Sequence, residues 1–176
     1  MILDPFIRPF PVGLFARLKR YSFKHQHQQS AGCVVYYRSK PNLEPEVLLI
    51  HRGGIYNDWV FPKGKIENNK NPESEAIRES FEEAGLKVRI ITKLTSDYYT
   101  FFMDEKKLKI SNQVHYFLAK SANQKVKLEQ SSKKNEASDF IEYGWFNIDM
   151  ATQKVKFPIQ RKILLEAKSY IYDRGG

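Results

Sequence analysis

The chain has 176 residues, of which 41% are hydrophobic and 28% are charged, and its formal net charge is +9 at pH 7. This length and apolar content favour one globular domain and exclude a disordered chain. The single cysteine, Cys33, excludes an internal disulfide. No apolar run approaches the roughly 20 residues that a membrane-spanning helix needs, so no membrane partner is expected. The positive charge indicates either a solvated lysine-rich surface or attraction to polyanions such as nucleotides and RNA.

Residues 1–29 form a basic N-terminal extension whose only acid is Asp4. A short amphipathic helix is predicted over residues 12–24. Such a segment is typical of an arm that packs on the domain or of a mitochondrial transit peptide, and the arm is favoured. A cytoplasmic location is therefore expected, with the mitochondrion as the alternative. The glutamine-rich stretch around His25 and His27 is predicted to be a linker rather than a metal site.

A domain over residues 30–176 follows the extension. Two apolar runs, residues 30–37 and 46–51, flank a proline-containing turn and predict a β-hairpin. Arg52 follows the second run and is either a phosphate ligand or a partner in a surface ion pair. The next loop, residues 61–65, contains two lysines around a flexible glycine.

A helix is predicted from Pro72 to Gly85, because Asn71 can cap it, proline fits its first position and glycine ends it. The face expected to pack on the core is made of Ile77, Ser80, Phe81 and Ala84. The opposite face carries the carboxylates of Glu75, Glu79, Glu82 and Glu83. Neighbouring carboxylates repel each other unless a cation lies among them, and Mg²⁺ takes oxygen ligands. A carboxylate helix behind a lysine-rich loop therefore indicates Mg²⁺-dependent phosphate chemistry, against the simpler interpretation of a solvated acidic face.

The elements predicted after this helix are a strand at 86–95, a hairpin with strands at 96–102 and 110–119, a strand at 139–147 and a helix at 158–172. The hairpin is rich in aromatic residues such as Tyr99, which are candidates either to stack on a nucleobase or to fill the core. The lysine-rich segment 121–138 is expected to be a solvated insert, with a nucleic-acid contact as the alternative.

The segment from Gly64 to Leu86 resembles the Nudix box, which reads glycine, five residues, glutamate, seven residues, then Arg-Glu-x-x-Glu-Glu-x-Gly. The residues in register with this motif are Gly64, Arg78, Glu79, Glu82, Glu83, Gly85 and Leu86. Two positions depart from it. Ser80 stands where a bulky aliphatic residue is usual, and Lys70 stands where the motif has glutamate. Lys70 either weakens the expected metal site or has been recruited to bind a substrate phosphate.

The resemblance implies an α/β protein with a curved mixed β-sheet sandwiched between helices (α/β/α). It also implies a hydrolase that uses Mg²⁺, with Mn²⁺ as an alternative, to cleave a nucleoside diphosphate linked to another group. Glu79, Glu82 and Glu83 would bind the metal ion. Arg78 would orient Glu82 or a neighbouring carboxylate rather than touch the substrate.

The general base varies within the resembled family, and it can be a glutamate of the box or one from a later segment. In this chain the later candidates are Glu136 and Glu142, of which Glu136 is favoured because it lies in the insert.

The candidate substrate-binding residues are Lys63, Lys65, Arg52, Gly64 and Tyr99. The run from Trp59 to Lys65 resembles family members that act on dinucleoside or diphosphoinositol polyphosphates. The run from Arg78 to Leu86 resembles members that act on RNA 5′ ends as well. The favoured substrate is a dinucleoside polyphosphate of the diadenosine tetraphosphate type. The alternatives are an RNA 5′-end pyrophosphohydrolase and a catalytically weak binding protein, and the oligomeric state is left open.

Overall fold

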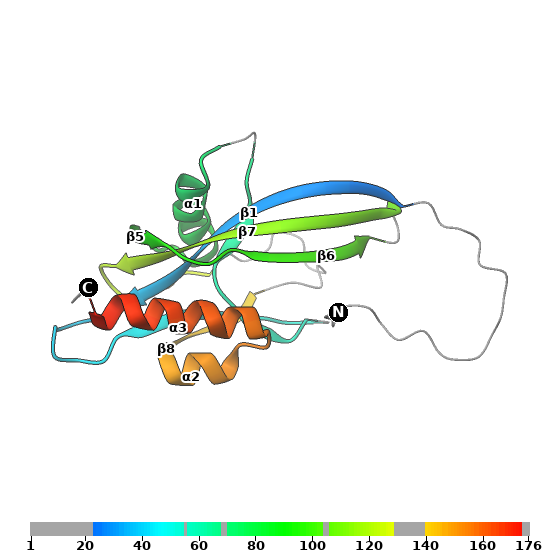
Figure 1. Cartoon of the computed structure of the whole chain (residues 1–176). Coiled ribbons are helices and arrows are strands. Elements are labelled where there is room, and N and C mark those ends of the chain that lie inside the picture. Colours follow the sequence, from blue (N-terminus) through cyan, green and yellow to red (C-terminus); the bar gives the residue numbers. More distant parts are fainter. Residues whose placement is uncertain (1–22, 55, 68–69, 104–105, 129–139, 174–176) are drawn as a thin grey trace.

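The computed structural model describes residues 23–173, except for 55, 68–69, 104–105 and 129–139 (Figure 1). The elements, in chain order, are β1 (Lys24–Tyr37), β2 (Glu46–Arg52), β3 (Asp58–Val60), β4 (Lys63–Lys65), α1 (Pro72–Ala84), β5 (Val88–Lys93), β6 (Asp97–Met103), β7 (Leu108–Ser121), β8 (Phe140–Asn147), α2 (Ile148–Lys154) and α3 (Pro158–Asp173). One mixed sheet contains all eight strands. Helix α1 lies on one side of this sheet, and α2 and α3 lie on the other (Figure 1).

The sheet is built around the long parallel pair β1 and β7, which is in register from Lys24↔Leu108 to Tyr36↔Lys120. The path through the sheet is β3-β2-β1-β7-β5, while β8 pairs with β2, β4 with β1 and β6 with β7. All of these other pairings are antiparallel. The hairpin predicted for the two aromatic-rich strands is confirmed by the β6–β7 pair.

Two apolar layers cover the two faces of the sheet because side chains alternate along β1. Val34 and Tyr36 pack with Leu164 and other residues of α2 and α3. Cys33 and Val35 pack with the residues of α1, such as Ala76. The predicted sandwich, with the acidic helix on one face and the C-terminal helix on the other, is therefore confirmed.

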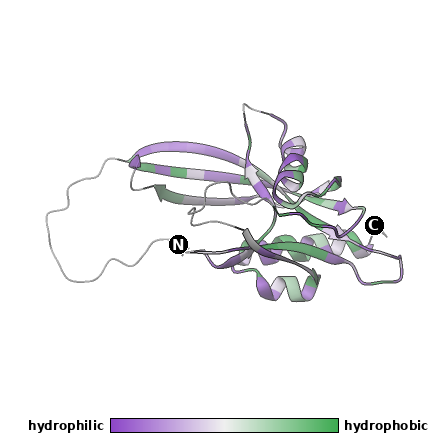
Figure 2. Cartoon of the chain, turned by 180° about the vertical axis from the view of Figure 1, so that it is seen from behind, coloured by the Kyte–Doolittle hydropathy of each residue, from purple (hydrophilic) through white to green (hydrophobic). Residues whose placement is uncertain are grey.

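The linker predicted around His25 and His27 is wrong, because β1 begins at Lys24 and residues 24–29 pair with β7. This end of β1 projects with β6 and β7 beyond the helices (Figure 1) and is hydrophilic (Figure 2). Within the part of the chain that the structure describes, residues 24–29 belong to neither buried apolar cluster, so no apolar alternation marked them as a strand. Residues 1–22, which include most of the predicted N-terminal helix, lie outside the described residues.

The face by which α1 contacts the sheet differs in part from the prediction, because Ser80 and Ala84 are buried as predicted but Ile77 and Phe81 are not. Ile77 and Phe81 are 36% and 53% exposed, whereas Ser80 is fully buried and Glu75 and Glu79 are 2% and 7% exposed. The contact is made by small side chains, Ala76, Ser80 and Ala84. Small residues let the helix backbone approach the sheet closely, which leaves no room for the larger side chains on that face.

Among the residues that the structure describes, no helix is long and apolar enough to cross a membrane.

Candidate active site

The lysine-rich segment is a short strand, β4, rather than a flexible loop. It pairs with β1 through Gly32↔Lys63, Ala31↔Gly64 and Ser30↔Lys65. A Cβ atom at Gly32 would lie 2.5 Å from the Pro62 carbonyl oxygen, so the close approach of the two strands requires glycine there. The sheet therefore holds both lysines in place beside α1.

Two of the predicted metal ligands contact β4 directly. A Cβ atom at Gly64 would lie 2.1–2.2 Å from the carboxylate atoms of Glu79, so the absence of a side chain at position 64 makes the space for this group. The backbone N–H of Lys63 donates to Glu83 Oε2 at 2.8 Å. The glycine of the box therefore brings the carboxylates of the helix against the backbone of the lysine strand.

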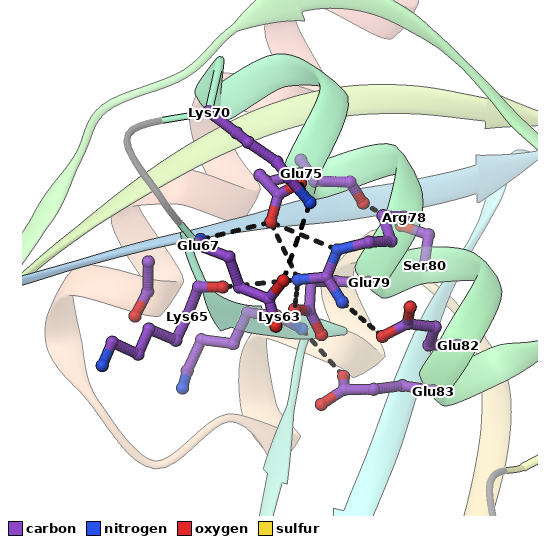
Figure 3. A network of polar contacts seen from close by, with 12 residues as sticks. Lys63, Lys65, Glu67, Lys70, Glu75, Arg78, Glu79, Ser80, Glu82 and Glu83 are labelled. Atoms are coloured by element: carbon purple, nitrogen blue, oxygen red, sulfur yellow. Dashed lines mark hydrogen bonds and ion pairs between the residues drawn. The ribbon is translucent and has the colours of Figure 1, made fainter.

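Arg78 is the centre of the polar network on α1 (Figure 3). Its Nε and Nη2 atoms donate to Glu75 Oε2 at 3.2 and 2.9 Å. The same guanidinium donates to the carboxylates of Glu79 and Glu82 and, at 3.3 Å, to the Lys65 carbonyl oxygen. Arg78 thus joins three glutamates of the helix to β4 through several N–H groups of one planar guanidinium, which a lysine ammonium cannot reproduce.

The network divides the glutamates electrostatically. Burial raises the pKa of Glu79, and the nearby charge of Glu82 adds to this, while Arg78 opposes both. The hydrogen bonds from Arg78 hold the pKa of Glu75 below its usual value. The same bonds raise the pKa of Arg78 itself. Burial therefore disfavours the charged form of Glu79 although Arg78 pairs with it.

The donor chemistry of Glu79, Glu82 and Glu83 fits a hard divalent cation such as Mg²⁺, which takes oxygen ligands. Burial disfavours the negative charge of Glu79, and a cation beside it would stabilise that charge. Over the described part of the chain, however, no three His, Cys, Asp or Glu side chains already converge on one point. The Arg78 guanidinium binds both Glu79 and Glu82, so these two carboxylates are turned toward it (Figure 3).

The other predicted substrate ligands lie on the sheet. Arg52 donates from Nε and Nη2 to the two carboxylate oxygens of Asp58 at 2.8 and 2.6 Å. This is the ion pair that the sequence left as one of two interpretations, and Asp58 is 5% exposed. Tyr99 is half-buried on β6 and packs against the core, and its hydroxyl oxygen accepts from Asn112 Nδ2 at 2.9 Å. Its ring therefore fills part of the core, while its hydroxyl is held by the hydrogen bond from Asn112.

The two later glutamates differ in what the structure says of them. Glu142 is exposed on β8, and its Oε1 lies 3.1 Å from His51 Nδ1. Glu136 lies outside the described residues.

Two carboxylates near the site were not singled out as site residues. Glu75 is one of them, since its burial could not be expected from a helix face counted as solvent-exposed. The other is Asp97, at the start of β6, where burial raises its pKa and the charge of Lys63 lowers it. Its one sequence signal is its spacing of two from Tyr99, which places both on the same face of a strand.

Known proteins resemble this chain over most of its length. The RNA pyrophosphohydrolase of Pasteurella multocida is 28% identical over 144 residues, which cover 75% of this chain and 71% of the relative. The m7GpppN-mRNA hydrolase dcap-2 of Caenorhabditis elegans is 28% identical over 109 residues, which cover 62% of this chain. The chain spans between 12% and 37% of the length of four of the curated relatives that it matches.

The fold is shared with solved structures. The C. elegans Ap4A hydrolase in a binary complex superposes with a TM-score of 0.63 at 21% identity, over 83% of this chain and 98% of the other. The family model of the NUDIX domain matches residues 26–167, well over half of the sequence. Together with the box geometry on α1 and β4, this match shows that the chain belongs to the NUDIX domain family.

Proposed function

We propose that this chain is a Mg²⁺-dependent pyrophosphohydrolase that cleaves a nucleoside diphosphate linked to another group. One observation carries the proposal: Arg78 gathers the carboxylates of Glu79 and Glu82 beside the lysine strand β4. A cluster of carboxylates beside a strand that carries two lysines suits metal-assisted attack on a phosphoric anhydride. The name of the Pasteurella relative, RNA pyrophosphohydrolase, supports the same class of reaction.

The residues of α1 and β4 at the site each have a role in this proposal. Glu79, Glu82 and Glu83 would hold Mg²⁺, which would supply a Lewis acid that offsets phosphate charge and activates water. Arg78 orients Glu79 and Glu82 and does not contact the substrate. Lys63 and Lys65 stabilise the negative charge that develops on the leaving phosphate. Gly64 provides the space that the Glu79 carboxylate occupies.

A dinucleoside polyphosphate of the diadenosine tetraphosphate type is the proposed substrate. A polyphosphate chain needs several cations, and Lys63 and Lys65 are held side by side on one strand. The Trp59-to-Lys65 run resembles family members that act on such compounds. The overall net charge of +9 agrees with a strongly anionic substrate.

RNA 5′ ends are the second candidate, favoured by the projecting end of the sheet. The β1–β7 and β6–β7 registers place His25, His27, Tyr98, Phe102 and Lys109 on one face. Tyr98 and Phe102 are 68% and 50% exposed, and the His25 and His27 rings lie 4.5 Å apart. Exposed aromatic rings beside a lysine suit single-stranded RNA, because every base can stack on a ring.

A substrate panel decides between these candidates. Product release with Mg²⁺ is measured on diadenosine tetraphosphate, a triphosphorylated RNA, a diphosphoinositol phosphate, ADP-ribose and dNTPs. The proposal expects turnover of diadenosine tetraphosphate that Tyr98→Ala/Phe102→Ala leaves unchanged. Turnover of the RNA, reduced by the same double variant and falling steeply with salt, would assign the RNA substrate instead. Binding of these ligands without turnover of any would identify a binding protein.

A further inference from the structure

Lys70, the residue that departs from the box, pairs with a buried carboxylate rather than facing the solvent alone. Its Nζ lies 3.7 Å from Glu75 Oε1 and 3.6 Å from Glu67 Oε2. The Glu75 side chain is 3% exposed, and its other oxygen, Oε2, accepts from Arg78 and, at 3.4 Å, from the Glu67 backbone N–H. Glu75 therefore lies between two cations, with one carboxylate oxygen directed at each (Figure 3).

We propose that Glu75 is a positioning residue of the active site: it supplies, from within α1, the carboxylate that the box has at position 70, and Lys70 is its counter-charge. In this arrangement Glu75 anchors one side of the Arg78 guanidinium. The Nη2 atom that donates to Glu75 also donates to Glu79, and Nη1 donates to Glu82; these two glutamates are proposed metal ligands. This inference rests on the proposed function, because it assigns an orienting role toward that metal site.

The extent of burial indicates that Glu75 orients Arg78 and, through it, the exposed Glu82. The Glu75 side chain is 3% exposed and the Arg78 side chain 25%, whereas Glu82 is 47% exposed. A guanidinium is planar, so fixing its Nε and Nη2 atoms on one carboxylate also fixes the direction of its remaining N–H groups. The buried end of the network therefore sets the orientation of its solvent-facing end.

The cation at position 70 follows from the same arrangement. A buried carboxylate is stable only when it is paired, and Glu75 also stands one turn from Glu79 on the helix. Lys70 offsets part of its charge from the side opposite Arg78. A glutamate at position 70 would instead place a second carboxylate against Glu75. The departure from the box is thus a relocation of its carboxylate from the loop to the helix.

The test removes the Glu75 carboxylate and then supplies a carboxylate from position 70 instead. Full-length Glu75→Gln, Lys70→Glu/Glu75→Gln and Lys70→Gln are compared with wild type, and Lys87→Glu, an exposed charge reversal just beyond α1, is the matched control. Mn²⁺ affinity is read from the electron paramagnetic resonance signal of the free ion. The apparent KM is measured at saturating Mg²⁺. Glu75→Asp, which keeps the charge but withdraws the carboxylate from Arg78, replaces Glu75→Gln if the latter does not fold.

Glu75→Gln is expected to weaken Mn²⁺ binding by about tenfold, the usual effect of removing an orienting partner, and Lys70→Glu/Glu75→Gln to recover most of this loss. Wild-type affinity in Glu75→Gln, or no recovery in the double variant, would overturn the proposal. A raised KM in Lys70→Gln with unchanged Mn²⁺ affinity would also overturn it, because Lys70 would then bind substrate. If the variants show the expected Mn²⁺ affinities but the wild-type protein hydrolyses none of the substrates, the proposed function is refuted and the positioning role of Glu75 still holds.

Discussion

At position 64 only a hydrogen atom stands between the backbone of β4 and the Glu79 carboxylate. The Cβ of an alanine there would overlap carboxylate atoms at 2.1–2.2 Å. Gly64→Ala is therefore expected to displace Glu79 and to weaken Mn²⁺ binding by about tenfold or more. Calorimetric titration with Mn²⁺ measures this. Lys87→Ala, which lies away from the carboxylates, serves as the control, and equal affinities in the two variants would contradict the assigned role of Gly64.

The raised pKa of Glu79 predicts how metal affinity depends on pH. A proton competes with the metal for this carboxylate, so affinity falls as pH decreases through a pKa above the ordinary value of 4.5. Arg78 lowers the pKa of Glu79. Removing the guanidinium in Arg78→Ala is therefore expected to move the loss of affinity to higher pH. Mn²⁺ titrations at a series of pH values test this, and a shift to lower pH would contradict the network.

Cys33 is a buried residue with a structural role. Its thiol is fully buried and donates to the Ala76 carbonyl oxygen at 3.5 Å, and burial raises its pKa to about 12. Because the thiolate is the reactive form, the native protein is expected to resist a thiol reagent at pH 8, whereas the unfolded chain exposes one reactive thiol. Ellman titration with and without denaturant measures this difference, and rapid labelling of the native chain would contradict the buried position.

At the scale of the element, the ends of α1 were predictable, but its buried face was predicted only in part, through Ser80 and Ala84. Asn71 accepts from the Glu73 N–H at 2.8 Å, and Gly85 adopts a left-handed conformation with φ 67°. These caps depend on neighbours in sequence, so local residue types reveal them. The face depends on how closely the sheet approaches, and counting apolar residues assigned Ile77 and Phe81 to it although both are exposed.

The corrected face predicts opposite effects for two neighbouring positions. Ala76 is fully buried against the sheet, so Ala76→Leu is expected to lower the free energy of unfolding by about 1–3 kcal/mol through overpacking. Ile77 is exposed, so Ile77→Ala is expected to change it by about 0.5 kcal/mol or less. Urea unfolding of both variants makes the comparison. A larger loss of unfolding free energy in Ile77→Ala than in Ala76→Leu would indicate that Ile77 packs on the sheet, as the sequence had suggested.

At the scale of the whole molecule, the sequence predicted the layers and the box but not the contacts between distant segments. The α/β/α arrangement was implied by the resemblance of the segment from Gly64 to Leu86 to the Nudix box, and the NUDIX match confirms the family. The pairing of β4 with β1, and the place of Asp97 near Lys63, depend on residues far apart in the chain. Neither local propensity nor spacing contains such information, so these parts of the site required the structure.

The measurement that tests the central claim most directly is the Mg²⁺ activation curve of hydrolysis, recorded with the best substrate for wild type and Glu82→Gln. The account predicts saturable activation by Mg²⁺ in the wild type. In Glu82→Gln it predicts a loss of turnover of about a hundredfold or more, with the midpoint moved to higher Mg²⁺ concentration. Turnover that is independent of Mg²⁺, or a Glu82→Gln variant as active as the wild type, would contradict a metal site on α1.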